Sequence, residues 1–504
     1  MGLIKWFSEL IGWYPADMSQ EERKLVFKID WLVLSFSCMA YFTKNLDVSA
    51  LTNAYVSGMG QDLDLDGNKF NYATSMYYVG YCLFQIPSNI VLTRLPAEYY
   101  LPAAEVAWGV FTLGTGFVKT YKQLMVLRFF VGLSATACYV GNAHIVNSWY
   151  TRQELGKRNA IYACVYPLGA MFSGYLQSAA YTNLDGKHSL PGWSWLFIIC
   201  GIITIPCSII GVIFCPNVPD RTKSRFLTAR EKELCVERLL KDGFAKTRGV
   251  DRQLLKRLFG DWRIYVFFII ANLYWMTFYP SGTPYTLWLS KLDKYSIPMI
   301  NNLSTITQAA TVVSTLLFGF YSDWRKSRAE PIFISGILIL VCNVMLLVWH
   351  IPDGAKFFAF IMLGVASGPT NLVIPWLAET YSHDLEARST SIAVCNVGWV
   401  VINLVVPLVA WPTKSAPRYF GGYVWSVVWS VIELVILPLP FILEKRDKKR
   451  GVDYRLQVLI DNGIVHERDS LEAYDDIESA GGNPSEKELT EKAKDANIGV
   501  TVIN

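Results

Sequence analysis

About twelve apolar stretches, each long enough to cross a bilayer as a helix, constrain this chain more than any other feature. A helix of about 19 residues spans roughly 30 Å of hydrocarbon. The expected spans are residues 29–50, 73–93, 101–118, 124–146, 160–180, 194–215, 264–288, 303–321, 331–350, 356–378, 390–411 and 422–443. These stretches are apolar nearly all round, whereas the helices of soluble proteins are amphipathic. The sequence therefore predicts an all-α polytopic membrane protein.

The spans fall into two groups of six around a charged linker, which is the layout of a duplicated transporter. The linker and the residues after the last span are rich in Lys and Arg, so we expect both termini in the cytoplasm. The expected parts are a cytoplasmic N-terminal segment (1–28), a six-helix bundle (29–215), a linker (216–263), a second six-helix bundle (264–443) and a disordered cytoplasmic tail (444–504). Within the linker, residues 228–240 have a helical charge pattern.

Composition narrows the classes of function. Hydrophobic residues make up 52% of the 504 residues and charged residues only 17%, and the charges gather at the ends and in the linker. A net charge of +4 placed in this way does not indicate a nucleic-acid partner. The ten cysteines contain no CxxC pair and lie mainly in apolar stretches, which disfavours disulfides and metal sites. We find no catalytic triad and no phosphate-binding loop, so we expect neither an enzyme nor a cofactor.

Charged side chains interrupt two of the early spans. Lys44, Asn45 and Asp47 lie in the first span and Arg128 lies in the fourth. A charge near the middle of a bilayer costs about 2.5–3.5 kcal/mol on insertion scales, so it normally faces a charge partner or a water-filled cavity. We therefore expect a polar path through the membrane, which makes transport the leading interpretation.

The expected directions of these two spans place their charges in the same half of the membrane, toward the outside. Arginine offers a planar fork that matches a carboxylate, and lysine offers a compact charge. We expect Lys44, Arg128 and Asn45 to bind a small organic anion, and Asp47 to neutralise a cation or to exchange a proton. The alternative is a structural Asp47–Arg128 pair that joins two helices.

Polar and aromatic side chains on other spans extend this hypothesis. His144 and Glu105 are candidates for proton coupling, the histidine because it titrates near physiological pH. Candidates that would stack on a substrate or hydrogen-bond to it lie in the second group of spans: Trp275, Tyr279, Asn371 and Asn396. The alternative for each is ordinary packing against a neighbouring helix.

A short motif closes the eighth span. Gly319 is followed four residues later by Asp323, and then by Arg325 and Arg328. A glycine allows close helix packing, an aspartate can cap or pair at a helix end, and basic residues favour the cytoplasmic side. The pattern resembles the cytoplasmic-loop motif of the major facilitator superfamily. By that resemblance we expect these four residues to take part in conformational gating.

Longer strings cover much of residues 12–445 and resemble one branch of that superfamily. They are Asn53-Ala-Tyr-Val-Ser-Gly58-Met, Ile86-Pro-Ser-Asn89, Thr93-Arg-Leu-Pro96, Arg128-Phe-Phe-Val-Gly132, Ser148-Trp-Tyr150, Gly192-Trp-Ser-Trp-Leu-Phe-Ile198, Pro219-Asp220 and Phe226-Leu-Thr228. The branch is the fungal allantoate permease group of anion:cation symporters, and within it the chain resembles pantothenate-transporter-like members. The resemblance implies a monomeric plasma-membrane carrier that takes up a small organic anion together with protons.

Two departures from that branch keep other functions open. Val48 and Ala50 stand where members commonly carry Arg and Asn, and residues 133–136 lack the glutamate that many members carry after the Arg-Phe of the fourth span. An exporter or an uncoupled carrier of an organic acid is therefore one alternative. A non-transporting nutrient sensor is the other, although the tail is short for a signalling domain.

Overall fold

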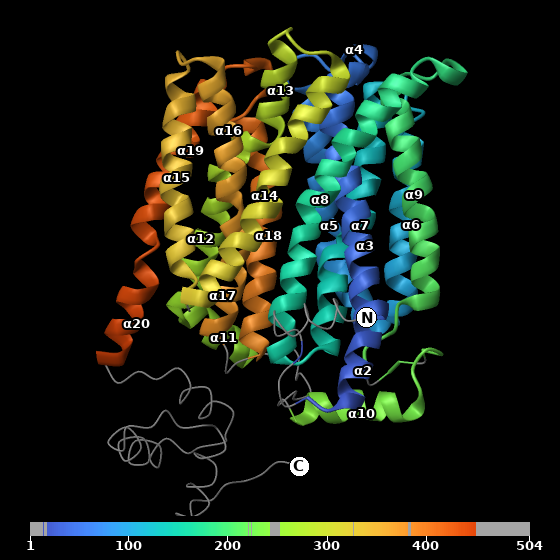
Figure 1. Cartoon of the computed structure of the whole chain (residues 1–504), viewed down its shortest axis with the longest axis vertical. Coiled ribbons are helices and arrows are strands. Elements are labelled where there is room, and N and C mark those ends of the chain that lie inside the picture. Colours follow the sequence, from blue (N-terminus) through green and yellow to red (C-terminus); the bar gives the residue numbers. More distant parts are fainter. Residues whose placement is uncertain are drawn as a thin grey trace, which may run out of the picture.

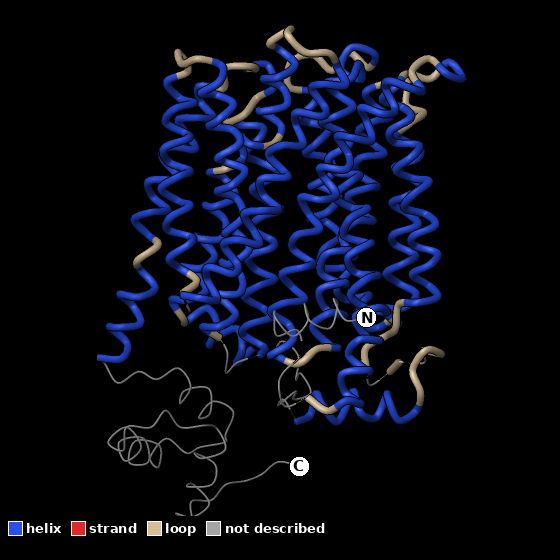
Figure 2. The backbone as a smooth tube through the Cα atoms, viewed as in Figure 1, coloured by secondary structure: helices blue, strands red, loops and turns tan. Residues whose placement is uncertain are grey.

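The computed structural model describes Tyr14 and residues 18–219, 221–222, 224–241, 252–325, 327–381 and 385–449. Over these residues the regular elements are helices (Figure 2). They form two bundles that stand side by side; α2 projects from one end of the first bundle in line with α3, and α10 lies across that end (Figure 1). We call the end with α2 and α10 the linker end, and the opposite end, with α4 and α13, the far end.

The first bundle begins with a long helix that changes pitch twice. Its segments are α2 (Gln20–Ile29), the π-helical η1 (Asp30–Leu34), α3 (Ser35–Ala54), the π-helical η2 (Tyr55–Met59) and α4 (Gly60–Asp62). The other helices are α5 (Lys69–Arg94), α6 (Ala97–Thr115), α7 (Tyr121–Trp149), α8 (Arg152–Leu184) and α9 (Gly192–Phe214), with the short 3₁₀ turn η3 (Lys187–Ser189) before α9. The linker contains α10 (Ala229–Lys241), where the sequence predicts a helix, and α11 (Arg252–Gly260).

The second bundle contains more interruptions than the first. Its elements are α12 (Trp262–Thr277), η4 (Tyr279–Ser281), α13 (Thr283–Lys291), α14 (Ile297–Arg325), α15 (Ala329–Val348), α16 (Asp353–Ser367), η5 (Gly368–Leu372), α17 (Val373–Thr380), α18 (Leu385–Val409), η6 (Thr413–Ser415), α19 (Phe420–Ile436) and α20 (Leu439–Lys449). The predicted tail starts at residue 444, but residues 444–449 still belong to α20. Most of the predicted N-terminal segment and residues 450–504 lie outside the described part of the chain.

Eight helical stretches of the described chain are long and apolar enough to cross a membrane: Gln20–Asp62, Gly192–Phe214, Trp262–Lys291, Ile297–Arg325, Ala329–Val348, Asp353–Thr380, Thr390–Val409 and Phe420–Asp447. Helices α5 to α8 lie alongside them in the first bundle (Figure 1). Each predicted span coincides with a helix or a pair of helices. The predicted class, an all-α polytopic membrane protein, is confirmed.

Three of the predicted spans are not single helices. The span predicted at 264–288 breaks at η4, which contains Pro280, and the span at 356–378 breaks at η5, which contains Pro369. The span at 422–443 breaks before α20, next to Pro438. Proline removes a backbone donor and clashes with the preceding turn, and membrane helices tolerate such breaks where neighbouring groups satisfy the freed carbonyls. Hydropathy windows average over these breaks, so the predicted spans do not show them.

Two glycines bring α5 and α7 into backbone contact. A Cβ added at Gly132 would collide with the carbonyl oxygen of Tyr77, and one at Gly80 would collide with the carbonyl oxygen of Phe129. Small residues at an interface let membrane helices approach closely. This contact fixes the position of the α5 segment that contains Tyr77, Tyr78 and Tyr81.

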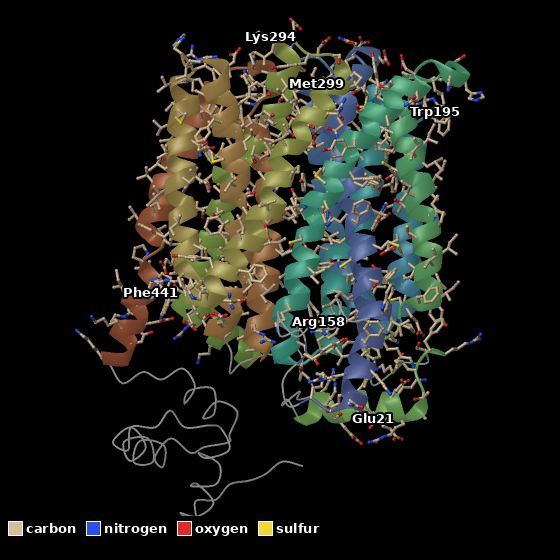
Figure 3. The ribbon with its side chains drawn as sticks, in the orientation of Figure 1. Glu21, Arg158, Trp195, Lys294, Met299 and Phe441 are labelled. Carbon is tan, nitrogen blue, oxygen red and sulfur yellow. The ribbon has the colours of Figure 1, made fainter. Side chains whose placement is uncertain are left out.

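Buried ion pairs hold the linker end of the first bundle together. Arg158, at the start of α8, is fully buried and donates to both carboxylate oxygens of Asp30 at 2.8 and 3.0 Å. Arg238 of α10 reaches Glu154 of α8 at 3.0 Å, so the linker helix is fastened to the bundle. Figure 3 shows Arg158 at this end, close to α2 and α10.

A more exposed pair adds a pH-dependent contact to this network. Lys28 of α2 donates to Glu231 of α10 at 2.8 Å. Burial acts to raise the pKa of Glu231, but hydrogen bonds from Lys28 and Thr228 outweigh it and hold the pKa below its ordinary value. A lowered folded-state pKa means that the contact stabilises the docked helix above the ordinary pKa of glutamate and is lost as the pH falls through the lowered value.

We expect Arg158→Ala to lower the free energy of unfolding by about 3–5 kcal/mol, because it removes the cation that pairs with the largely buried carboxylate of Asp30. The measurement is thermal and denaturant unfolding of the purified protein in detergent. Arg230→Ala is the matched control, because Arg230 of α10 makes only exposed ion pairs and should change stability by about 1 kcal/mol or less. Equal effects of the two substitutions would show that the buried pair does not hold this end together.

Candidate functional site

Lys44 lies inside the first bundle among tyrosine rings. It belongs to α3 and is only 5% exposed. Its Nζ atom lies 5.1 Å from the ring centroid of Tyr81 on α5 and 5.7 Å from that of Tyr41 on its own helix. A cation over the face of an aromatic ring is attracted by the ring's quadrupole. Among the described residues, aromatic side chains therefore hold Lys44, which the sequence predicts as a site residue.

The ring contacts around Lys44 continue across both bundles and return to it. Tyr41 contacts Tyr166 of α8 at 6.5 Å, and Tyr166 contacts Trp275 of α12 at 6.2 Å. The contacts then run from Trp275 to Trp399 at 5.5 Å, from Trp399 to Tyr78 at 6.1 Å, from Tyr78 to Tyr77 at 5.1 Å and from Tyr77 to Tyr81 at 6.1 Å. We call these seven side chains the aromatic cage: Tyr41, Tyr77, Tyr78, Tyr81, Tyr166, Trp275 and Trp399.

Hydroxyl groups from both bundles converge on the cage. The hydroxyl of Tyr78, from the first bundle, donates to Oδ1 of Asn403 on α18 of the second bundle at 3.5 Å, and Tyr81, Tyr166 and Tyr279 lie near Tyr78. The Nε1 atom of Trp399 is buried and has no hydrogen-bond partner among the described residues. One buried cation, several hydroxyls and flat apolar faces form a suitable environment for an anion with an apolar or amide-containing body.

Asp47 and Arg128 form a separate buried group within the first bundle. Asp47 accepts a hydrogen bond from Thr112 of α6 at 3.2 Å. Arg128 stacks over the Phe197 ring of α9 at 5.4 Å and interacts electrostatically with Asp47 and with Tyr77 of the cage. Over the described residues, Asp47 Oδ1 and Arg128 Nε and Nη2 have no hydrogen-bond partner. The structure therefore brings Arg128 and Asp47 near each other and surrounds Lys44 with a different set of side chains.

Glu105 occupies a third buried position, also inside the first bundle. It is 2% exposed and lies close to Asn142 of α7 and Ser208 of α9. Its Oε1 atom has no partner among the described side chains. His144 is on the same helix as Asn142, but the position of its side chain lies outside what the structure describes. The proton-coupling roles expected for Glu105 and His144 stay predictions.

The other predicted substrate contacts differ in their surroundings. Trp275 is a member of the cage, and Tyr279 adjoins it and packs against Trp411 at 5.6 Å. Asn45 donates to the carbonyl of Tyr41 in its own helix at 2.6 Å, and Asn371 donates weakly to Thr315 at 3.4 Å. The Nδ2 atom of Asn396 is buried without a described partner. Asn45 and Asn371 have described partners, whereas the side-chain nitrogen of Asn396 has none among the described residues.

The motif at the end of α14 forms an ion-pair cluster at the linker end. Arg328 reaches Asp323 at 2.6 Å and Glu379 of α17 at 2.9 Å, and Arg325 reaches Glu330 at 3.1 Å. The close helix contact expected at Gly319 was wrong, because a Cβ added there would meet no atom within 4 Å. The motif therefore joins α14, α15 and α17 through side-chain charges and not through close backbone packing.

Hydrogen bonds between the two bundles gather at the far end. They connect Thr52 with Thr283 (3.2 Å), Asn301 with Ser57 (2.9 Å), and Asn71 with the carbonyls of Pro407 and Trp411 (2.8 Å each). These residues lie where α3, α5, α13, α14 and α18 approach that end (Figure 1). Two further hydrogen bonds between the bundles lie deeper along α5 and α18, from Ser75 to the carbonyl of Leu404 (3.1 Å) and from Tyr78 to Asn403 (3.5 Å). The bundles are therefore fastened together on the side away from the linker.

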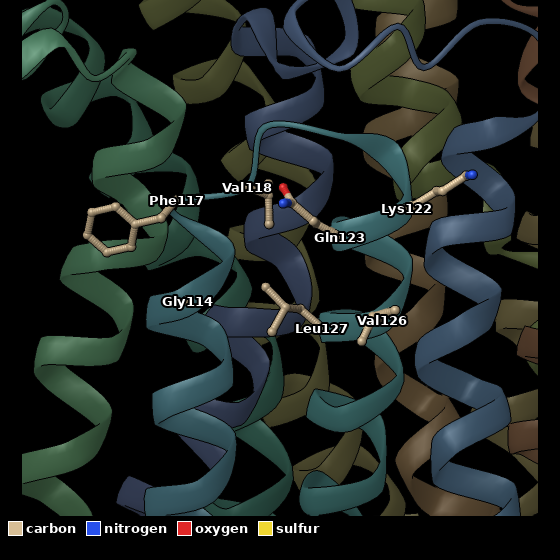
Figure 4. Close-up of a pocket in the computed structure, with 7 residues that line it drawn as sticks. All are labelled: Gly114, Phe117, Val118, Lys122, Gln123, Val126 and Leu127. Atoms are coloured by element: carbon tan, nitrogen blue, oxygen red, sulfur yellow. The ribbon is translucent and has the colours of Figure 1, made fainter.

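A surface pocket at the far end lies apart from the cage. It is lined by Gly114, Phe117, Val118, Lys122, Gln123, Val126 and Leu127, between the end of α6 and the start of α7 (Figure 4). Phe117 and Val126 are each 54% exposed, so this pocket opens on the outer surface of the bundle. None of the seven is a predicted site residue.

Comparison with known proteins identifies the architecture. The sequence profile of the Major Facilitator Superfamily matches residues 37–407. The chain belongs to this superfamily. Members of the superfamily are membrane transporters and not enzymes, so the expectation that this chain is a transporter and not an enzyme is confirmed.

Curated relatives and solved structures agree with this assignment to the superfamily. The chain is 32% identical to "Pantothenate transporter liz1" of Schizosaccharomyces pombe over 459 residues, covering 89% of this chain and 86% of the relative. It is 30% identical to "Vitamin H transporter" of Saccharomyces cerevisiae over 479 residues, covering 92% and 78%. Among solved structures, the xylose transporter XylE from E. coli matches with a TM-score of 0.60 at 10% identity, covering 81% of this chain and 98% of that one, which shows a shared fold.

The sequence predicts Lys44 as a candidate site residue but does not predict most of the aromatic cage around it. Tyr41, Tyr78, Tyr81 and Tyr166 were not among the predicted residues, although each is buried or partly buried. One signal was present in the sequence: Tyr77 and Tyr81 are four residues apart on the same expected helix, so they share a face. Nothing in the sequence showed that this face meets Lys44.

Proposed function

We propose that this superfamily member is a secondary active carrier of a small organic anion, of the class of vitamin-like carboxylates such as pantothenate. The relatives that share about a third of its residues over most of their length include two named as pantothenate transporters and one named as a vitamin H transporter. Pantothenate and biotin each combine a carboxylate with an amide-containing body. That combination suits one buried cation beside hydroxyls and flat rings.

The observation that carries this proposal is the position of Lys44 inside a cage built from both bundles. Tyr41, Tyr77, Tyr78, Tyr81 and Tyr166 come from the first bundle, and Trp275 and Trp399 come from the second. A ligand held there would contact both bundles, so rocking one bundle against the other would change its exposure to each side of the membrane. In this account Lys44 binds the carboxylate and the rings enclose the remainder of the molecule.

The contacts between the bundles support a direction of access. Their hydrogen bonds gather at the far end, so we infer that this conformation is closed there and admits substrate from the linker end. Lys and Arg are concentrated in the linker and after the last span, which places the linker end in the cytoplasm by the positive-inside rule. Both termini would then be cytoplasmic, and the far end would face the outside of the plasma membrane. The Asp323–Arg328–Glu379 cluster would gate movement at the cytoplasmic end.

Coupling to protons is the second part of the proposal. The described first bundle contains three buried acids, Asp47, Glu105 and Glu154. Glu154 is paired with Arg238 of the linker helix, and of the other two only Asp47 has a described cation close by. The absence of an acid at residues 133–136 favours one rival, an uncoupled carrier or exporter of an organic acid. A proton ionophore separates the two, because it would collapse accumulation by a symporter and leave an uncoupled carrier unaffected.

The test is uptake of labelled pantothenate by yeast cells that lack their own pantothenate carrier. We expect saturable uptake that acid outside the cells stimulates, and competition by other carboxylates that share an amide or ring body. Biotin, nicotinate and allantoate form the competitor panel, with pantothenol, which has no carboxylate, as the matched control. Uptake that pantothenol inhibits as well as pantothenate does would contradict recognition of the anion by Lys44.

A further inference from the structure

A buried carboxyl group in the second bundle has no part in the site described so far. Glu433 lies on α19 and is 1% exposed. Its Oε2 atom lies 3.4 Å from the hydroxyl of Thr277, and its Oε1 atom has no hydrogen-bond partner among the described residues. An ionised carboxylate enclosed in this way is costly unless a cation or several donors compensate it.

The groups that surround Glu433 are polar but uncharged. The titratable group that faces Glu433 is the hydroxyl of Tyr274 on α12. This hydroxyl is hydrogen-bonded to the hydroxyl of Ser335 and to the carbonyl of Ala366. From α15, Asn343 donates to the carbonyl of Thr277 at 2.8 Å, and from α19 itself Ser430 lies 3.5 Å from Asn343. The contacts described for this cluster include no lysine, arginine or histidine, so no described cation neutralises the carboxyl group.

The hydrogen bonds of Thr277 indicate where a proton sits. Its Oγ1 atom lies 2.8 Å from the carbonyl oxygen of Tyr274 and 3.4 Å from Glu433 Oε2. A hydroxyl group has one proton to donate. When that proton goes to the nearer carbonyl, the contact with Glu433 is a hydrogen bond only if the carboxyl group carries its own proton and donates it to Thr277.

The cluster lies at the break in the seventh predicted span. Helix α12 ends at Thr277, and α13 begins at Thr283 after the 3₁₀ turn that contains Pro280. The carbonyls freed there are satisfied by the cluster, since Ser426 donates to Met276 at 3.3 Å and Asn343 donates to Thr277. Beyond the break, Thr283 makes one of the hydrogen bonds that fasten the bundles at the far end.

We propose that Glu433 is a proton-binding site that links protonation to the break between α12 and α13. In the conformation closed at the far end, the neutral carboxyl group donates to Thr277 and the break is held as described. Loss of the proton leaves a carboxylate that repels the carbonyl-rich break, and this favours a rearrangement of α13 and release of its contact with Thr52. The inference rests on the proposed symport, because it assigns one coupled proton to the second bundle: one proton binds Glu433 on one side of the membrane and leaves it on the other.

The first experiment compares Glu433→Gln with the wild-type protein in proteoliposomes. Glutamine keeps the shape of the side chain but cannot exchange a proton. We expect a pH gradient, acid outside, to stimulate wild-type uptake of labelled pantothenate by about tenfold and uptake by Glu433→Gln by less than about twofold, a change within the usual range of coupling between sites. Exchange of labelled for unlabelled pantothenate without a gradient should stay within about twofold of wild type, since the cage is intact.

Two further variants and an infrared spectrum test the proton-binding role of Glu433. Ser430→Ala is the matched control, because it perturbs the same cluster without removing an acid and should keep the response to pH. Glu433→Asp retains an acid and should keep part of that response if Glu433→Gln proves unstable. The infrared absorption of protonated carboxyl groups in the reconstituted protein should lose one band in Glu433→Gln and none in Ser430→Ala.

Failure of the proposed transport function and failure of the proposed role of Glu433 give different results. If wild type does not transport pantothenate or the competitor carboxylates, the proposed function fails, and the infrared comparison alone then decides whether Glu433 holds a proton. If wild type transports and Glu433→Gln keeps the full response to the pH gradient, the coupling role of Glu433 is refuted while the proposed function stands. An unchanged carboxyl band in Glu433→Gln would also refute it.

Discussion

Replacing Lys44 with glutamine is expected to weaken carboxylate binding by about 100-fold, because removing one partner of a buried charge pair costs about 2–5 kcal/mol. Glutamine keeps most of the side-chain stem and removes the charge, so the tyrosines of the cage keep their neighbours. The measurement is the concentration of unlabelled pantothenate that halves uptake, together with the shift in melting temperature that saturating pantothenate produces. In Lys44→Gln, we expect uptake to be nearly abolished at micromolar substrate and the ligand-induced shift to disappear.

A second lysine gives a matched control for this prediction. Lys69 lies 5.9 Å from the ring of Tyr121 and donates to the carbonyl of Asp64 at the far end of the bundle, outside the cage. Lys69→Gln removes a lysine over a tyrosine ring in the same way and should leave uptake unchanged. Lys44→Arg keeps the charge and should retain partial uptake, limited by the larger head group. Normal uptake by Lys44→Gln would remove Lys44 from the binding site.

The site residues that the sequence predicts best are the charged ones, because charged residues are unusual in membrane-spanning segments. Lys44, Asp47 and Arg128 stand out because charges are rare and costly in apolar spans. Their burial below 6% exposure in the structure agrees with that reasoning. The sequence does not predict which of these three side chains lie close together. Helical periodicity shows which residues share a face of a helix, but not which neighbouring helix that face contacts.

The aromatic cage shows most clearly which contacts cannot be predicted from the sequence. The chain has 27 tyrosines and 17 tryptophans, so any single aromatic residue is unremarkable in the sequence. Tyr166 and Trp275 belong to different bundles and meet only because the bundles pack together, a contact 109 residues apart in the chain. Such long-range contacts are set by tertiary packing and carry no local signal.

The helix breaks in the second bundle have signals in the sequence, but the hydropathy of the neighbouring residues outweighs those signals. Pro280 with Gly282, and Gly368 with Pro369, are ordinary signals for ending a helix. A window of about 19 residues gives them little weight against their apolar neighbours. Hydropathy alone therefore does not predict that α12 ends at Thr277, or that Glu433, Asn343 and Ser426 lie around that end.

The second large effect that we expect concerns Arg128, and it separates two interpretations of the buried charges. Arg128→Ala should lower the free energy of unfolding by about 3–5 kcal/mol, because it leaves Asp47 enclosed without its nearest described cation. Cells should then contain little of the protein at the membrane, and their uptake should fall in proportion. Asp47→Asn in the same chain removes the uncompensated charge, so the double variant should recover most of the stability.

The transport activity of that double variant decides the role of Arg128. If Arg128 and Asp47 form a structural pair beside the cage, the recovered protein should transport pantothenate within about threefold of wild type per folded molecule, because Lys44 and the cage are unchanged. If Arg128 instead binds the substrate carboxylate, the recovered protein should be folded but inactive even in the exchange of labelled for unlabelled pantothenate, which does not depend on proton coupling through Asp47. The structure favours the first outcome, since Arg128 stacks on Phe197 and interacts with Asp47, whereas the rings that contact Lys44 come from Tyr41 and Tyr81. Uptake normalised to the amount of folded protein, measured for both single variants and the double variant, separates a loss of folding from a loss of binding.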